Sequence, residues 1–142
     1  MLRSTIAICG LLALASCAPP APVGAIKIEN ARIAAPPPGA AVAAAYFTLR
    51  NGGPPDQLVA ASSPAAASAE LHATQNDAGM MSMHHMEGVD LPAGGVVEFA
   101  PGGQHIMLTG LTQPLLAGAS QPITLSFAHA QPVTVNFAVL AP

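Results

Sequence analysis

Methionine and histidine are concentrated in one short segment of the chain. Of the six methionines, all except Met1 and Met107 lie in the run Met80-Met81-Ser82-Met83-His84-His85-Met86. Methionines that only fill gaps in a hydrophobic core would be scattered along the sequence. Their concentration beside histidines instead makes this segment a candidate source of metal ligands.

The remaining methionine, Met107, lies two residues after His105. In a β-strand this spacing places both side chains on one face, while Ile106 and Leu108 point the other way, into the core. Thioethers are soft and imidazoles borderline, and both are neutral. A site with two of each suits monovalent copper better than zinc, calcium or magnesium. Without a thiolate, such a site would leave the ion exchangeable to a partner that offers thiolates.

Short segments of β-forming residues, separated by Pro, Gly, Asn and Asp, dominate the chain after residue 25. This pattern predicts an all-β sandwich or barrel. The apolar residues of 123–127 and 133–137 alternate, which predicts a closing hairpin. The alanine-rich stretches 40–45 and 65–69 have helix propensity, but each runs directly into a strand pattern. The predicted strands are 25–33, 43–50, 57–62, 69–74, 80–83, 96–99, 105–109, 123–129 and 133–140.

The first residues have the pattern of a bacterial lipoprotein signal. A basic residue precedes an apolar run that is too short to span a bilayer, and Leu14-Ala15-Ser16 leads into Cys17. We therefore expect a signal peptide at 1–16, a lipidated Cys17 with a Pro-rich tether at 17–24, and one domain at 25–142. The alternative is an ordinary secretory signal with a free Cys17. Of the two cysteines, Cys9 lies in the signal, so no disulfide is expected.

Composition and the available side chains argue against two further classes of function, nucleic-acid binding and catalysis. The 142 residues are 51% hydrophobic and only 8% charged, with four Lys and Arg and a net charge of -3. So few cations cannot neutralise a row of phosphates, which argues against nucleic-acid binding. We also expect no enzyme, because no Ser, Cys or Lys nucleophile has an evident base beside it. A copper-dependent oxidase would be the enzymatic alternative.

The spacing of histidines and methionines resembles that of a known family. His72, Met83, His105 and Met107 reproduce the H-x10-M-x21-H-x-M pattern of the periplasmic copper chaperones called PCuAC. Nearly the whole predicted domain is similar to that family, including Glu70-Leu71-His72 and Pro101-Gly102-Gly103-Gln104-His105-Ile106-Met107-Leu108. One departure is Thr74, where family members often carry a further methionine.

This resemblance implies a cupredoxin-like or Ig-like β-sandwich of Greek-key type, with Cu(I) held by His72, Met83, His105 and Met107. It also implies delivery of copper toward cytochrome c oxidase, alongside Sco-type thiol proteins. Sequestration of excess copper, or a structural lipoprotein domain without a metal, remain as alternatives.

Other residues near the motif allow two interpretations. Met81, His84, His85 and Met86 could form a second, weaker copper site or a solvated loop, and Met81 would share a face with Met83. We expect His129 to be a satisfied surface histidine and Glu70, Glu87 and Asp90 to be solvated. Ala18 after the lipidated cysteine favours the outer membrane, facing the periplasm, with the inner membrane as the alternative.

Overall fold

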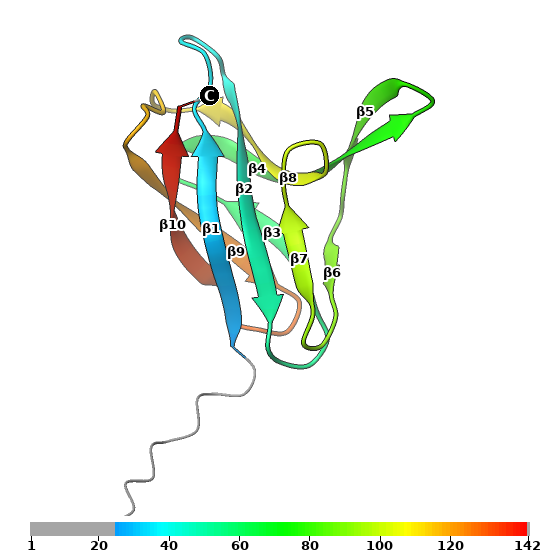
Figure 1. Cartoon of the computed structure of the whole chain (residues 1–142). Helices are drawn as coiled ribbons and strands as arrows, with labels where there is room; N and C mark the ends of the chain where they lie inside the picture. Colours follow the sequence, from blue (N-terminus) through cyan, green and yellow to red (C-terminus); the bar gives the residue numbers. More distant parts are fainter. Residues whose placement is uncertain (1–24, 142) are drawn as a thin grey trace, which may run out of the picture.

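The described residues, 25–141 of a computed structural model, form ten β-strands (Figure 1). No helix within this range is long and apolar enough to cross a membrane. The predicted signal peptide, Cys17 and the whole of the predicted tether lie outside the described residues. The strands are β1 (Ile26–Ala34), β2 (Val42–Asn51), β3 (Asp56–Ser62), β4 (Ala66–Asp77), β5 (Met80–His85), β6 (Val89–Leu91), β7 (Val96–Phe99), β8 (Gln104–Leu111), β9 (Ser120–Phe127) and β10 (Val133–Leu140).

The strands pair into one sheet that closes on itself. Neighbours follow the order β4, β8, β2, β1, β10, β9 and β3, and β3 pairs back to β4 through Ala61 and Ala69. β7 lies beside β2 and β8, whereas β5 and β6 extend the sheet beyond β4 and β3. Most pairs are antiparallel, but β1 is parallel to β10 and β7 is parallel to β8. The arrangement confirms the predicted all-β fold class, a cupredoxin-like β-sandwich.

Alternating apolar residues build the core between the two walls of this closed sheet. In β2, Ala43, Ala45, Phe47 and Leu49 are buried, while the residues between them are more exposed. Phe47 stacks on Phe99 of β7, with ring centroids 4.2 Å apart. The predicted hairpin of the last two strands is confirmed, since β9 pairs antiparallel with β10.

The largest difference from the predicted strands is around the methionine segment. Strand β4 begins at Ala66 and continues to Asp77, and β5 continues to His85, so the two form a long hairpin that projects from the body of the domain (Figure 1). The turn uses Ala78 and Gly79, which both have positive φ. The Gly79 N–H donates to the Asn76 side-chain oxygen at 3.0 Å, which closes the turn. The alanine-rich residues at the start of β4 are thus extended rather than helical.

Two smaller differences have local causes. Strand β6 was not predicted, because its three residues lie between Gly88 and Pro92 and are too few to show a periodicity. Strand β9 ends at Phe127 rather than at His129. The His129 N–H instead donates to the Asp56 carboxylate at 3.0 Å, which turns the chain away from the sheet.

Strand β2 runs the length of the domain, from Val42 at one end to Asn51 at the other, and we name the two ends after residues near them. At one end Asn51 pairs with Ile26, near Asp56 and His129, and we call this the Asp56 end. At the other end Val42 pairs with Thr109 of β8. Because Val42 lines a pocket together with Met81, Met83 and Met107, we call this the methionine end.

Candidate metal site

Strand register places three histidines in one row across β5, β4 and β8. His72 of β4 pairs with His105 of β8 on one side and with His85 of β5 on the other. Directly paired residues of antiparallel strands project from the same face of the sheet. The ring centroid of His72 lies 6.0 Å from that of His105 and 5.7 Å from that of His85. The fold therefore brings together histidines that lie far apart in the sequence.

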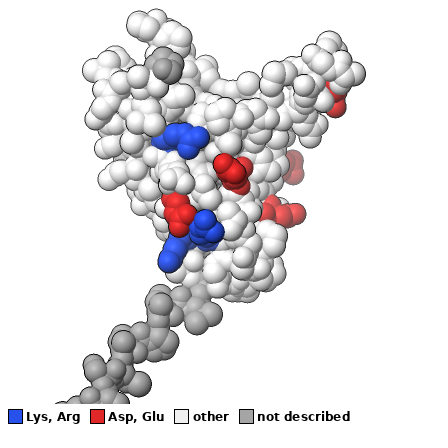
Figure 2. All heavy atoms as spheres, viewed as in Figure 1, with Lys and Arg blue, Asp and Glu red and all other residues white. Residues whose placement is uncertain are grey.

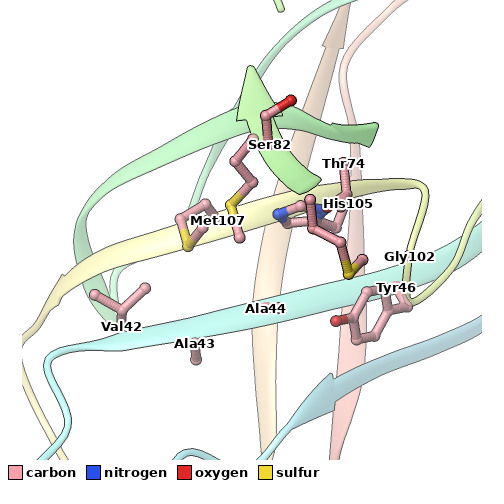
Figure 3. A pocket seen from close by; sticks show the side chains of 11 residues that line it. Val42, Ala43, Ala44, Tyr46, Thr74, Ser82, Gly102, His105 and Met107 are labelled. Carbon is pink, nitrogen blue, oxygen red and sulfur yellow. The ribbon is translucent and has the colours of Figure 1, made fainter. Parts of the chain in front are cut away.

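A pocket of about 590 Å³ lies beside this row, between β2, β8 and the projecting hairpin. Figure 3 shows His105 and Met107 of β8 directed toward this space, with Tyr46 on the β2 side. The prediction that they share a face is confirmed, since Ile106 and Leu108 are fully buried on the opposite, core face. The pocket is lined by Val42, Ala43, Ala44, Tyr46, Thr74, Met81, Ser82, Met83, Gly102, His105 and Met107.

His105 is held in one orientation by its surroundings. Its side chain is buried, and Nδ1 lies 3.2 Å from the carbonyl oxygen of Gly103. A carbonyl oxygen can only accept, so Nδ1 carries the proton and donates to it. The Nε2 atom then keeps its lone pair and can bind a metal. A hydrogen bond that fixes the second ring nitrogen is typical of metal-ligating histidines.

His72 is oriented by a carboxylate. Its Nε2 donates to the Glu70 side chain at 3.1 Å, and its Nδ1 is buried with no hydrogen-bond partner among the described residues. A buried nitrogen without a partner costs free energy unless a ligand occupies it. His72 does not line the pocket in the described structure. We therefore expect its side chain to shift if it binds the same ion as His105.

The contact between Glu70 and the candidate ligand His72 was missed by the sequence interpretation. The Glu70 side chain is about half exposed, as expected for a solvated residue, but it also binds His72. The available signal was its spacing, because residues 70 and 72 of one strand share a face. Tyr46 was also missed as a lining residue, and its ring centroid lies 6.3 Å from that of His105.

The methionine sulfurs come from more exposed positions. Met83 and Met81 of β5 are 57% and 68% exposed, and both line the pocket. Met83 pairs with Thr74, so it stands one row away from the three histidines. On the face shown in Figure 2, charged side chains gather over the central and lower parts, and uncharged surface covers most of the upper part. The methionine end therefore offers soft, neutral sulfur donors, and acidic side chains lie near them on β4, at Glu70 and Asp77.

The four candidates for a second site, Met81, His84, His85 and Met86, do not all point in the same direction. Met81 and His85 share a face with Met83, as the strand alternation predicts. His84 points the other way, and its Nε2 lies 3.0 Å from the Ser82 hydroxyl. Met86 packs against the hydrophobic core. His129 is exposed and its ring contacts Asp56 at 3.2 Å, as expected for a satisfied surface histidine.

The fold and site define a class of protein: an all-β domain in which the imidazole of His105 and the thioethers of Met81, Met83 and Met107 line one pocket. Within residues 25–141, no three His, Cys, Asp or Glu side chains are already grouped to hold a metal, whereas three methionines line the pocket beside His105. Soft donors of this kind select a soft, monovalent ion.

Comparison with known proteins gives the family. The model of the LpqE-like family, described as "Putative lipoprotein LpqE-like", matches residues 26–139. The chain belongs to this family, and its fold is that of the PCuAC domains that the sequence motif indicated. A curated protein described as a putative lipoprotein, from Leifsonia xyli subsp. xyli (strain CTCB07), is 44% identical over 62 residues. That segment covers 43% of this chain and 37% of the relative.

Two solved structures extend the comparison over the whole domain. The copper-bound PCuAC domain from PmoF2 is 32% identical, with a TM-score of 0.72, and the match covers 84% of this chain and 96% of that one. The Cu(I) form of DR1885 from Deinococcus radiodurans is 34% identical, with a TM-score of 0.65. The match covers 84% of this chain and 79% of that chain. The relatives of this domain thus include proteins whose structures contain copper.

Proposed function

We propose that the protein is a copper carrier that binds one Cu(I) ion through His72, Met83, His105 and Met107. One observation carries the proposal most directly. His105 and Met107 face the same pocket as Met83, and His105 is held by Gly103 so that Nε2 is free to bind. The copper-bound relatives support the choice of metal.

The donor set also supports transfer rather than permanent binding. All four proposed ligands are neutral when they bind, and none is a thiolate. A partner with thiolates can therefore compete for the ion. Met83, more than half exposed, gives such a partner access to one of the bonds to copper. We accordingly propose carriage to an acceptor, with cytochrome c oxidase assembly and Sco-type proteins as the acceptors that the family resemblance favours.

The proposed location follows from the residues before the domain. Cys17 would carry a lipid and Ala18 would favour the outer membrane, which places the domain in the periplasm. Membership of a lipoprotein family supports the lipid anchor. Labelling cells with a radioactive fatty acid tests it, because a Cys17→Ala chain should take up no label while the unaltered chain does.

Titration of Cu(I) against a competing chelator tests the binding proposal. The chain from Ala18 onward should bind one equivalent. Met83→Ala and His105→Ala should each weaken binding by roughly tenfold or more, because losing a direct ligand costs at least as much as losing a residue that supports one. His129→Ala is the matched control, since this exposed histidine lies at the Asp56 end. Binding by both site variants equal to that of the control would refute the ligand assignment.

A transfer experiment separates carriage from sequestration. The Cu(I)-loaded chain is mixed with a dithiol protein, the two are separated, and copper is measured in each. A carrier passes its copper to the dithiol within the mixing time. Retention of copper against an excess of dithiol protein would favour sequestration.

A further inference from the structure

We propose that His85 gives the domain a second set of ligands, in which His85, His72 and His105 together bind Cu(II). The inference rests on the proposed copper site, because it shares two histidines with it. It differs in the oxidation state of the ion and in the third ligand, an imidazole from β5 in place of the thioethers.

The argument begins with the row of histidines. His72 stands between His85 and His105 in the strand register, and its ring centroid lies within 6.0 Å of both others. Three imidazoles from three adjacent strands therefore project from one face. The Met83 thioether comes from the next row, opposite Thr74. The same face thus carries a nitrogen-rich row beside a sulfur-rich pocket.

Burial and hydrogen bonding show how freely each of the three rings can move. His105 is buried and tied to Gly103, and His72 is tied to Glu70 with a buried Nδ1 that has no partner among the described residues. His85 is exposed. The three rings are not already grouped to hold a metal in the described structure. An exposed side chain on an edge strand can rotate at little cost, so we assign the larger movement to His85, in addition to the shift of His72 that the Cu(I) site also requires.

Donor chemistry then selects the ion. Imidazole nitrogens are good ligands for Cu(II), which binds a given set of nitrogen donors more tightly than the other divalent first-row metals. Thioethers favour Cu(I) instead. Since both ligand sets include His72 and His105, the domain would hold one copper ion at a time. His84 and Met86 are excluded from the Cu(II) set, because His84 faces away and Met86 packs on the core.

The experiment compares both oxidation states in the same variants. Cu(II) is titrated in a glycine buffer as competitor, and electron paramagnetic resonance reports the nitrogen ligands. His85→Ala should weaken Cu(II) binding by roughly tenfold or more and reduce the nitrogen couplings. Cu(I) affinity should change by less than about twofold, because His85 is not in the Cu(I) set. His84→Ala, the adjacent histidine on the same strand, should leave both affinities unchanged.

Met83→Leu should give the opposite pattern, with weakened Cu(I) binding and retained Cu(II) binding. Cu(II) affinity that is equal in His85→Ala and His84→Ala would overturn the inference while leaving the Cu(I) proposal standing. Binding of Cu(I) but no Cu(II) by the unaltered chain would also overturn the inference and leave the Cu(I) proposal standing. Failure of the unaltered chain to bind Cu(I) would instead refute the proposed function, so the two failures are distinguishable.

Discussion

The two ends of the domain satisfy their polar groups in opposite ways. At the Asp56 end, Asp56 accepts hydrogen bonds from the backbone of Gln57, His129 and Ala130 and from the His129 ring. The amide of Asn51 donates to the carbonyls of Pro54 and Leu91 at 2.8 and 3.1 Å. At the methionine end, the buried His72 Nδ1 has no partner within the described chain.

We infer that the Asp56 end mainly stabilises the fold, whereas the methionine end provides the candidate binding site. Saturated polar groups close the Asp56 end, where loops meet and the sheet needs to be tied together. At the methionine end, the Nδ1 atom of His72 has no hydrogen-bond partner among the described residues, and the thioethers of Met81 and Met83 are exposed. These groups remain free to bind a ligand. A fold gains stability from satisfied groups and gains a binding site from unsatisfied ones. Substitutions should therefore affect unfolding at one end and copper binding at the other.

Met107→Leu should produce the largest change in copper binding. Leucine has a similar volume but no sulfur, and swaps of this kind usually cost less than about 1.5 kcal/mol of stability. We expect Cu(I) affinity to fall by about 100-fold, which corresponds to roughly 2.7 kcal/mol. Chelator competition measures the affinity and thermal unfolding measures the stability. A large drop in melting temperature would show that Met107 is primarily a packing residue.

Asp56→Asn should produce the largest change in stability without affecting copper. Although burial raises the pKa of Asp56, the hydrogen bonds from Gln57, Ala130 and His129 outweigh it and lower the pKa from 3.8 to about 2. An amide would turn an N–H toward these donors, so we expect the melting temperature to fall by several degrees and Cu(I) affinity to stay the same. Differential scanning calorimetry and copper titration test both expectations.

The pH dependence of stability sharpens this prediction. Because folding lowers the pKa of Asp56, its ionised form stabilises the native state fully above pH 3.8. The stabilisation is lost as the pH falls from 3.8 toward about 2. Urea unfolding across this range should show that the difference in stability between the unaltered chain and the Asp56→Asn variant shrinks with acid. A constant difference would mean that the carboxylate charge plays no part.

Glu70→Ala should have a smaller effect on copper than loss of a ligand. Without the carboxylate, the His72 ring is no longer held with Nε2 as donor, and loss of such a supporting residue typically weakens metal binding by roughly 10-fold to 100-fold. We expect the lower part of that range, because Glu70 is about half exposed. Glu98→Ala, on β7, is the control. Rescue by Glu70→Gln, whose side-chain oxygen can accept the same hydrogen bond, would support the orienting role.

Met80→Leu should have the smallest effect. This residue is the most exposed methionine of β5, at 76%, and it does not line the pocket in the described structure. We expect Cu(I) affinity within about twofold of the unaltered chain. An effect as large as that of Met83→Leu would mean that the hairpin presents its sulfurs interchangeably.

Much of this arrangement could be predicted from the sequence, because strand alternation is a local property. The opposite faces of His105 and Ile106, and the final hairpin, followed directly from residue spacing. The row of histidines could not be predicted, since it depends on the register between β4, β5 and β8. The burial of His105 likewise depends on chain segments far from it in sequence, including Tyr46. Strand β6 was too short to give any periodic signal.

The edge position of β5 has a consequence for the rate of exchange. This strand pairs with β4 alone, and most of its residues are exposed. In the proposed site, the sulfur of Met83 would therefore leave the ion while His105, in the centre of the sheet, stays in place. We expect copper release to proceed by stepwise replacement of donors, beginning at β5, without unfolding of the core. The lifetime of the loaded state would then be set by the opening of one hairpin rather than by the stability of the domain.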